Sequence, residues 1–274
     1  MTNSQCLNEA VTLLSQSGID DARFDAECLF EKIFGISKSQ YLLLKNDTVD
    51  EKKIGLFFEL VNRRKSGEPL QYILGEWEFY GLHFKVGEGV LIPRSDTEIL
   101  VDYVLENKAS DNPVIYDLCS GSGCIGIAVA KNMPESEVYM AEKSELAYEY
   151  LLKNIKLNKT QNTKPYLKQI PDVLDDLPDA DIIISNPPYI KTDELPTLQK
   201  EVQFEPSMAL DGGEDGLDFY RMLKEYAFPK LKKGGYIIME CGDTQAREVA
   251  EIFSTDIILK DYNSIERAVV RRKE

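Results

Sequence analysis

The apolar residues in the first quarter of the chain recur with the spacing of amphipathic helices. Leu7, Val11 and Leu14 fall on one helical face, because residues three and four apart lie above one another along a helix. A second apolar run ends before Gly35, and glycine commonly terminates helices because it adopts the left-handed conformation without strain. The pattern predicts a small helical domain over residues 1–68.

Two pairs of polar residues mark where helices of this domain begin. Ser37 with Gln40, and Thr48 with Glu51, have the three-residue spacing of a capping box. In that motif each of the two side chains accepts a hydrogen bond from the backbone N–H of the other residue. This satisfies donors that a helix leaves unpaired at its start. We therefore expect one helix to begin after Ser37 and another after Thr48.

After this domain the pattern changes to short apolar and aromatic runs separated by glycines. The stretch LQYILGEWEFYGLHFKVGEGVLIP is rich in β-branched and aromatic residues and contains Gly75, Gly81, Gly87 and Gly89. Such a composition favours strands and tight turns. It predicts a connector of one or two β-hairpins over residues 69–95.

The remainder, residues 96–274, alternates short apolar runs with runs of helical period. PVIYDLC, EVYMAE, ADIIISN and GGYIIME indicate buried strands, and CIGIAVAKN, LAYEYLLKNIKLN and AREVAEIF indicate helices. This alternation is typical of a mostly parallel sheet with helices on both faces, since each crossover between parallel strands needs a long connection. The chain is therefore predicted to be an α/β protein preceded by a helical domain.

The net charge of the chain limits the kinds of partner that the protein is expected to bind. The 274 residues carry a net charge of −15, with 47 acidic and 32 basic side chains. A nucleic-acid backbone requires a basic surface, so we expect no direct nucleic-acid binding. No stretch approaches the ~20 continuous apolar residues that span a bilayer, and MTNSQCLNEA lacks the regions of a signal peptide. We expect a cytoplasmic protein with no membrane partner.

Cysteine and histidine usage disfavours a metal site. The five cysteines are odd in number and scattered, without a CxxC pair, and His83 is the single histidine. Zinc sites need clusters of such residues at short spacing, whereas a scattered set suits a reducing compartment. We expect free thiols and no bound metal.

The segment VIYDLCSGSGCIGIAVA joins an apolar strand, a glycine-rich turn and a helix. Gly121 and Gly123 permit positive φ and let a ligand approach the backbone at the helix N-terminus, which indicates a nucleotide-like ligand. Asp117, at the junction of strand and loop, disfavours a pyrophosphate and suits an ammonium group. S-adenosylmethionine carries an ammonium, a sulfonium and a ribose but no phosphate. Taken alone, the loop is also compatible with a dehydrogenase or a structural turn.

Acidic residues follow two further strands. Glu142 ends the next apolar run, about 20 residues after the glycine loop, where a carboxylate accepts hydrogen bonds from ribose hydroxyls. Asp172, beside Val173, is placed near the end of another strand. The rest of the acidic stretch up to Asp181 is interpreted as a solvated face, so Asp172 is its one candidate for ligand contact.

The strand IIIS is followed directly by Asn186, Pro187, Pro188 and Tyr189. Prolines lack an N–H, so nearby carbonyls are freed from the sheet, and the Asn186 side chain adds a second acceptor. Two such acceptors would engage both donors of a substrate –NH₂ group and aim its nitrogen at an activated methyl carbon. Tyr189 would stack on a planar amide or base. The simpler alternative is a turn that ends the strand.

These motifs together resemble the release factor glutamine methyltransferase family. The similarity spans nearly the whole chain and includes EPLQYILGEWEFYG, VLIPRSDTE, DLCSGSGCIGIAVA, SNPPYI, EPSMALDGGEDGLDFYR and MECGDTQ. Members have a helical domain and a Rossmann-like class I methyltransferase domain, and they use S-adenosylmethionine to methylate the glutamine of the Gly-Gly-Gln loop in peptide-chain release factors. The resemblance implies the same fold, cofactor and protein partner here.

The resemblance also implies roles for individual residues. Asn186 to Tyr189 would hold the substrate glutamine as the catalytic group, and the helical domain would help to bind the release factor. Motif and resemblance together give as cofactor-binding residues Asp117, Cys119, Ser120, Gly121, Ser122, Gly123, Glu142, Asp172, Val173 and Asn186.

Three positions depart from the family pattern. Cys119 stands where the family usually has glycine, Ser95 where it has proline, and Glu142 where it has aspartate. A small thiol can replace glycine if φ is negative at that position, and glutamate keeps two acceptor oxygens at slightly longer reach.

Other functions and roles are open at this point. A glutamine of a ribosomal protein is an alternative substrate, and an adenine or guanine amino methyltransferase would use the same tetrapeptide, although the acidic charge disfavours it. Arg94 would bind a ligand carboxylate or form a salt bridge, and DGGEDG at 211–216 would be a cation site or, preferably, a loop. Glu240 is interpreted as a helix cap.

Overall fold

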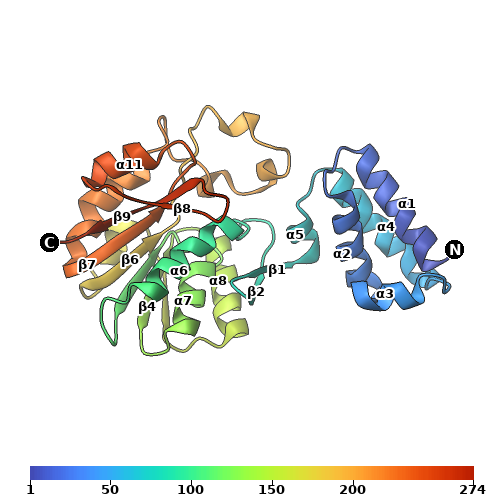
Figure 1. Ribbon diagram of the computed structural model, residues 1–274, viewed down its shortest axis with the longest axis horizontal. Coiled ribbons are helices and arrows are strands. Elements are labelled where there is room, and N and C mark those ends of the chain that lie inside the picture. Colours follow the sequence, from blue (N-terminus) through green and yellow to red (C-terminus); the bar gives the residue numbers. More distant parts are fainter. The chain divides into compact units, whose positions relative to one another are not determined.

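The computed structural model describes residues 1–274, and these residues form two compact units. One consists of Met1–Gly75 with Gln199–Phe204, and the other of Glu76–Leu198 with Glu205–Glu274 (Figure 1). The chain therefore leaves the larger unit for a short segment and returns to it. Sequence patterns alone gave no sign of this excursion.

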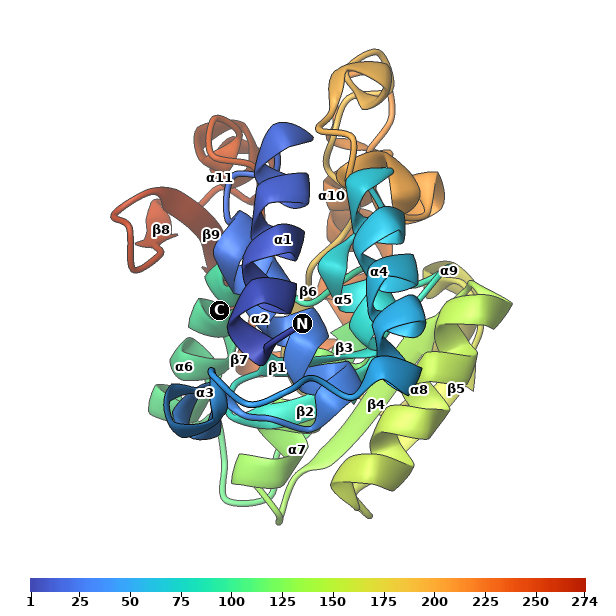
Figure 2. The ribbon, with the colours of Figure 1, turned by 90° about the vertical axis from the view of Figure 1, so that its right-hand side faces the viewer.

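The smaller unit is helical. Its helices are α1 (Asn3–Gln16), α2 (Ala22–Phe34), α3 (Lys38–Leu44), α4 (Glu51–Lys65) and α5 (Leu70–Leu74). α1, α2 and α4 pack against one another (Figure 2), and their core contains the rings of Phe30, Phe34 and Phe57 in mutual edge or tilted contact. This aromatic contact gives a short helical unit enough buried apolar surface to hold its helices together.

One of the two expected helix starts is confirmed. Ser37 caps α3, and its capping box with Gln40 is complete in both directions. α4 instead begins after Asp50, whose carboxylate accepts a hydrogen bond from the Lys52 N–H. The expectation for Thr48 was wrong because a carboxylate two residues nearer the helix satisfies the same orphan donors.

A buried ion pair lies inside this unit. The Arg64 guanidinium donates to Asp25 at 2.6 Å and to Glu201 at 2.5 Å, and the Arg64 and Asp25 side chains are only 5% and 7% exposed. Burial raises the pKa of Asp25 despite the attraction of Arg64, so desolvation of the carboxylate exceeds the stabilisation it receives from the guanidinium. The pair therefore depends on both partners being present.

The larger unit begins with a single hairpin, β1 (Glu76–Phe79) and β2 (Leu82–Lys85), paired antiparallel from Glu76↔Lys85 to Phe79↔Leu82. The preceding five residues, which the sequence assigned to the hairpin connector, form helix α5. Gly75 ends that helix in the left-handed conformation, and helical packing in the smaller unit overrides the β-propensity of LQYIL.

A seven-stranded sheet forms the centre of the larger unit, in the order β5-β4-β3-β6-β7-β9-β8. The five strands from β5 to β7 pair in parallel, and β9 pairs antiparallel with both β7 and β8, which confirms the expected mostly parallel sheet. The strands are β3 (Val114–Leu118), β4 (Glu137–Glu142), β5 (Thr163–Leu167), β6 (Ala180–Ser185), β7 (Leu231–Glu240), β8 (Ile257–Lys260) and β9 (Glu266–Arg272). The strand order reverses at β3, and such a switch point opens a crevice beyond the carboxyl ends of the strands.

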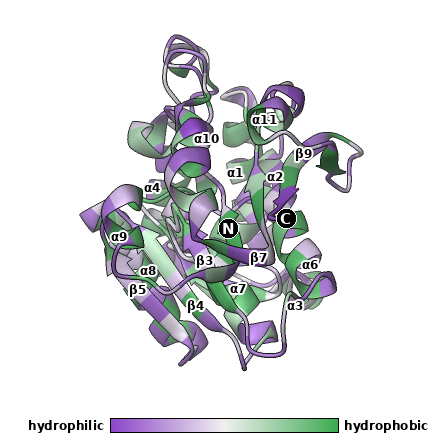
Figure 3. Ribbon diagram, turned by 90° about the vertical axis from the view of Figure 1, so that its left-hand side faces the viewer, coloured by the Kyte–Doolittle hydropathy of each residue, from purple (hydrophilic) through white to green (hydrophobic).

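Helices cover both faces of this sheet. α6, α7 and α8 contribute Leu100, Ile127 and Leu151 to one hydrophobic cluster, and α10 and α11 contribute Tyr220 and Val249 to the other. Hydrophobic stretches of α6, α7 and α11 are green in Figure 3. The helices are α6 (Glu98–Glu106), α7 (Cys124–Asn132), α8 (Glu145–Asn158), α9 (Ile170–Leu174), α10 (Asp218–Met222) and α11 (Ala246–Phe253), preceded by the short helix η1 (Ser95–Thr97).

None of these helices combines the length and the apolar character that crossing a membrane requires. All five cysteines are free thiols, as their spacing predicted. The core is thus held by apolar packing and by a few buried polar contacts, without covalent crosslinks.

We predict that Arg64→Met lowers the free energy of unfolding by about 3 kcal/mol, because it leaves the Asp25 carboxylate buried without its cation. Urea denaturation monitored by circular dichroism measures the change. The neighbouring variant Arg63→Met is the matched control: Arg63 pairs with Glu68 at an exposed position, so its loss costs about 1 kcal/mol or less. Equal effects of the two variants would contradict the importance of the buried pair.

Candidate functional site

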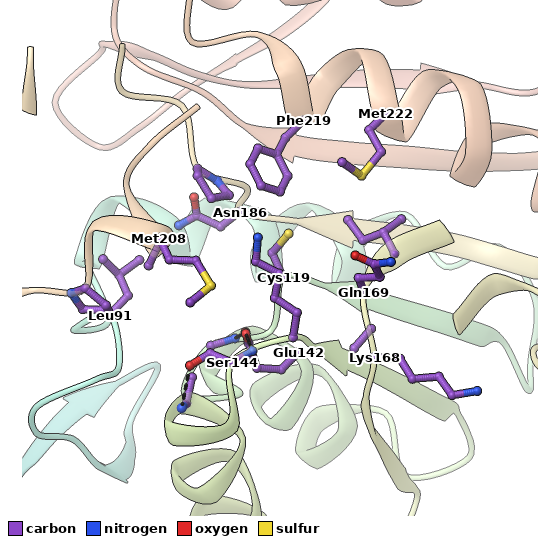
Figure 4. A pocket seen from close by; sticks show the side chains of 18 of the residues that line it. Leu91, Cys119, Glu142, Ser144, Lys168, Gln169, Asn186, Met208, Phe219 and Met222 are labelled. Atoms are coloured by element: carbon purple, nitrogen blue, oxygen red, sulfur yellow. Dashed lines mark hydrogen bonds between the residues drawn. The ribbon is translucent and has the colours of Figure 1, made fainter. Parts of the chain in front are cut away.

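A cavity that is open to solvent lies at the carboxyl ends of β3, β4 and β6. Figure 4 shows Cys119 between Asn186 and Glu142 in its wall. The loops that follow three adjacent parallel strands meet here because the strand order reverses at β3. The lining residues are Gly89, Leu91, Cys119, Gly121, Ala141, Glu142, Lys143, Ser144, Ala147, Lys168, Gln169, Ile170, Pro171, Asn186, Pro188, Pro206, Met208, Ala209, Phe219 and Met222.

The glycine loop connects β3 to α7 and adopts the expected backbone. Gly121 has φ 53° and Gly123 has φ 82°, the left-handed region that glycine reaches without strain. A Cβ on Gly123 would collide with the Leu151 side chain, whereas Gly121 faces open space. Gly123 thus allows α7 and α8 to pack closely, and Gly121 keeps the cavity wall free of a side chain.

Cys119 also lies in the left-handed region, with φ 64°. The condition under which a thiol replaces glycine without strain, a negative φ, is therefore not met, and the position carries roughly 1–2 kcal/mol of backbone strain. Burial, followed by the charge of Glu142, raises the pKa of the Cys119 thiol to about 12. The thiol stays neutral and narrows the cavity without acting as a nucleophile.

Asp117 lies at the end of β3 and is fully buried, outside the cavity lining. Its Oδ2 accepts a hydrogen bond from the Gly126 N–H at 3.0 Å, and its Oδ1 has no partner. Burial raises its pKa to about 7, and the Gly126 hydrogen bond opposes the shift. A buried carboxylate oxygen without a donor is costly, and it is available to a donor from a ligand or a water molecule.

Glu142, the last residue of β4, lies at the cavity wall and braces two loops. Its Oε2 accepts a hydrogen bond from the Gly121 N–H at 2.8 Å, and its Oε1 accepts one from the Ser144 N–H at 2.7 Å. Each carboxylate oxygen has a further lone pair. The side chain therefore retains capacity for hydroxyl donors while it fixes the glycine loop relative to α8.

Besides Asp117, the lining excludes five of the cofactor-binding candidates, which are Ser120, Ser122, Gly123, Asp172 and Val173. Ser120 donates to the Asp117 carbonyl oxygen at 2.7 Å, Ser122 is buried, and Val173 belongs to the hydrophobic core. Asp172 does not follow a strand directly: it lies in the first turn of α9, exposed, and accepts a hydrogen bond from the Gln169 side chain at 2.9 Å.

The residues that line this side of the cavity come earlier in the same segment. They are Lys168, Gln169, Ile170 and Pro171, which follow the last residue of β5. Sequence patterns did not reveal these residues because β5 (TKPYL) lacks the continuous apolar run of a buried strand. The strand lies at the edge of the sheet and is only partly buried. A search for the residues directly after each strand would have found them.

The tetrapeptide after β6 divides between cavity and core. Asn186 and Pro188 line the cavity, and Pro187 and Tyr189 do not. The Tyr189 ring packs against the hydrophobic cluster beneath α10 and α11, and burial raises the pKa of its hydroxyl above the usual value. In this arrangement Tyr189 anchors the corner, and the ring is not presented to the cavity.

The loop at 211–216 closes over this corner. The Gly212 N–H donates to the Ile190 carbonyl oxygen at 2.8 Å, and a Cβ on Gly212 would come within 2.7 Å of the Tyr189 Cα. Asp211 accepts hydrogen bonds from the Thr192 hydroxyl and the Gly213 N–H. In this structure DGGEDG is a packed loop that holds the tetrapeptide.

Arg94, whose role the sequence left open, forms an ion pair with Glu205. The Glu205 carboxyl is 1% exposed and also accepts a hydrogen bond from the Ile92 N–H at 2.9 Å. The next residues supply an apolar wall of the cavity, Pro206, Met208 and Ala209. The ion pair therefore fixes the start of that wall.

Comparison with known proteins defines the class first. Residues 95–204 match the family model described as "Methyltransferase small domain", and residues 5–75 match the "PrmC N-terminal domain". The larger unit is a methyltransferase domain of the Rossmann-like class I type, with a mostly parallel sheet between two helical layers.

Curated relatives then define the family. The chain is 40% identical to a release factor glutamine methyltransferase of Thermodesulfovibrio yellowstonii over 91% of this chain and 92% of the relative. It is 39% identical to that of Fusobacterium nucleatum over 99% of this chain and 79% of the relative, and 35% identical to that of Moorella thermoacetica over the whole of both chains. The chain belongs to the release factor glutamine methyltransferase family.

We predict that Cys119 reacts slowly with iodoacetamide despite lining the cavity, because at pH 8 about one thiol in ten thousand is ionised. Its alkylation rate, followed by peptide mapping, should rise about tenfold per pH unit up to about pH 10 without a plateau. The unfolded protein, whose thiols ionise normally, provides the control. A plateau near pH 8 or 9 in the folded protein would contradict the assignment of a neutral, inert thiol.

Proposed function

We propose that this protein methylates the side-chain amide nitrogen of the glutamine in the Gly-Gly-Gln motif of peptide-chain release factors. The observation that carries the proposal is the cavity at the sheet switch point, in which Asn186 and Pro188 share a wall with the glycine loop and Glu142. One site thereby combines amide-recognising acceptors with features suited to a nucleoside. Membership of the family supports the choice of substrate.

The cavity suits S-adenosylmethionine as the methyl donor. Two carboxylates, Glu142 in the wall and Asp117 beneath the glycine loop, favour a cationic ligand over a phosphate. Glu142 would accept from ribose hydroxyls, and the unpartnered Asp117 Oδ1 would receive a donor from the amino-acid end. Cys119 and Gly121 would line the ligand, and Ser120, Ser122 and Gly123 would shape the loop behind them. Val173 and Asp172 would support the segment near the base. When bound, the group supplies a methyl carbon activated by a sulfonium.

The corner at Asn186 would orient the glutamine amide. Its –NH₂ group has two donors, and the Asn186 Oδ1 together with a backbone carbonyl oxygen of the proline corner would supply two acceptors that engage both. The nitrogen then presents one free face, and positive charge that develops on it is stabilised by the same oxygens. Pro187, Pro188 and Tyr189 keep the two acceptors fixed, so little reorganisation is needed during the reaction.

The protein partner would bind through both parts of the chain. We infer a substrate-recognition role for residues 1–68, with residues 69–95 as connector and residues 96–274 as the catalytic domain. The net charge of −15 opposes direct binding to a nucleic-acid backbone, which disfavours an amino methyltransferase of adenine or guanine. A ribosomal-protein glutamine is the remaining alternative substrate. Either protein substrate would be met in the cytoplasm, where translation takes place.

We predict that the protein transfers label from S-adenosylmethionine to a full-length release factor, and poorly to a short Gly-Gly-Gln peptide, because docking supplies orientation. Duplex DNA and ribosomal proteins are assayed alongside. Label on DNA or on a ribosomal protein, with none on the release factor, would overturn the proposal.

Asn186→Ala should lower kcat by about 10²-fold or more, as loss of an oriented transition-state hydrogen bond does. Affinity for S-adenosylmethionine, measured by calorimetry, should change little. Asn132→Ala is the matched control, because Asn132 ends α7 and bonds only the Ala128 carbonyl oxygen. Undiminished turnover of Asn186→Ala would remove the role of the acceptor.

A further inference from the structure

A polar cluster outside the cavity lining contacts Asn186. Ser185 pairs with Met239 in the parallel register of β6 and β7, so the next residues, Asn186 and Glu240, lie side by side where the two strands end. Thr97, at the end of η1, completes the cluster. Thr97 and Glu240 are each only 2% exposed, so their polar atoms have few partners besides one another and Asn186.

The cluster determines which atom of the Asn186 amide faces the cavity. Its Nδ2 donates to the Thr97 hydroxyl oxygen at 3.3 Å. Hydrogen bonds from the Thr97 and Asn186 side chains also stabilise the ionised form of Glu240. A carboxylate only accepts hydrogen bonds, so the amide meets Glu240 through its N–H. The oxygen Oδ1 is left to accept from the cavity.

Glu240 is an unusual residue for this place. Its Oε2 has no hydrogen-bond partner, and burial raises its pKa to about 7. Arg267 lowers that pKa and Asp96 raises it. The other titratable groups that interact with Glu240 are Cys124, Tyr189, Tyr220 and Cys241. Arg267 is itself bonded to Asp261 at 3.2 Å. The sequence interpretation of Glu240 as a helix cap does not explain a carboxyl buried beside Asn186.

We propose that Glu240 is a positioning residue: as a carboxylate it holds the Asn186 amide with Oδ1 toward the cavity, and on protonation it reverses that orientation. This inference rests on the proposed function. A protonated Glu240 gains an O–H donor, which pairs with Oδ1 and turns Nδ2 to the cavity. Two N–H donors would then oppose the –NH₂ group of the substrate, so the amide could not be held.

The direction of the pH effect follows from these contacts. Glu240 accepts hydrogen bonds only when ionised, so the competent orientation is present above its pKa and is lost as pH falls through that value. With a pKa of about 7, kcat should decline below neutrality, approaching a tenfold loss per pH unit. Arg267 and Asp96 act on the pKa of Glu240 in opposite directions, so neither charge alone sets the ionisation of this carboxyl.

The first test measures kcat for a full-length release factor between about pH 5.5 and pH 9, at saturating S-adenosylmethionine. Glu240→Gln should lower kcat roughly tenfold or more at pH 8. It should also abolish the decline of kcat at acidic pH (the acid limb), because the new glutamine side chain neither titrates nor selects one orientation of Asn186. Its affinity for S-adenosylmethionine should match that of the parent protein, which also verifies folding. Glu137→Gln, at the exposed start of β4, is the control and should keep the acid limb.

A second test exchanges the two side chains. Asn186→Asp alone places a carboxylate beside Glu240 and should be nearly inactive. In the double variant Asn186→Asp with Glu240→Gln, the new amide donates to one oxygen of the new carboxylate, and the other oxygen faces the cavity as an acceptor. The double variant should exceed Asn186→Asp by about tenfold or more in kcat, the size of coupling seen between contacting residues.

The outcomes separate this inference from the proposed function. No methylation of the release factor by the parent protein would overturn the function itself. An active parent whose acid limb and kcat survive in Glu240→Gln would overturn the positioning role alone. An exchange variant no better than Asn186→Asp would also overturn it, because orientation of the amide would then not be the quantity that Glu240 controls.

Discussion

The parallel pairing of β3 with both β4 and β6 is the constraint on which the site depends. Leu118 is in register with Ala141 on one side and with Ser185 on the other. The residues that follow these positions are the glycine loop, Glu142 and Asn186, so one row of backbone hydrogen bonds sets their separation. A slip of one residue would turn each side chain to the opposite face of the sheet. The chemistry of the cavity is therefore fixed by strand register before any side chain is placed.

The same strand ends hold two buried carboxyls, Asp117 and Glu240, each with one oxygen that lacks a partner. Neither has a buried cation dedicated to it, and burial raises the pKa of both to about 7. The contrast with Asp25, which is paired with Arg64 in the helical unit, is informative. Asp25 serves the fold and has a cation as its partner, whereas the two carboxyls behind the cavity wall each keep one acceptor oxygen unused. Buried carboxyls with raised pKa values are typical of functional sites.

Local patterns predicted those parts of the structure that depend on local physics. The alternation of strands and helices, the positive φ of Gly121 and Gly123 and the capping box at Ser37 each follow from a few neighbouring residues. The failures share one cause. Packing against distant segments decides three of them: helix α5, the left-handed backbone of Cys119 and the position of Asp172 in α9. The fourth is the segment 199–204, which joins the helical unit because Arg64 binds Glu201 far along the chain. Such contacts override local propensity.

The clearest limit of a motif concerns Asn186 itself. The sequence shows that an amide follows β6, and an amide has both an acceptor and a donor end. Which end faces the cavity is decided by Thr97, before β3, and Glu240, at the end of β7. With the amide reversed, the same four residues would repel the group that they are proposed to hold. The recognition chemistry is therefore a property of the folded cluster and not of the tetrapeptide.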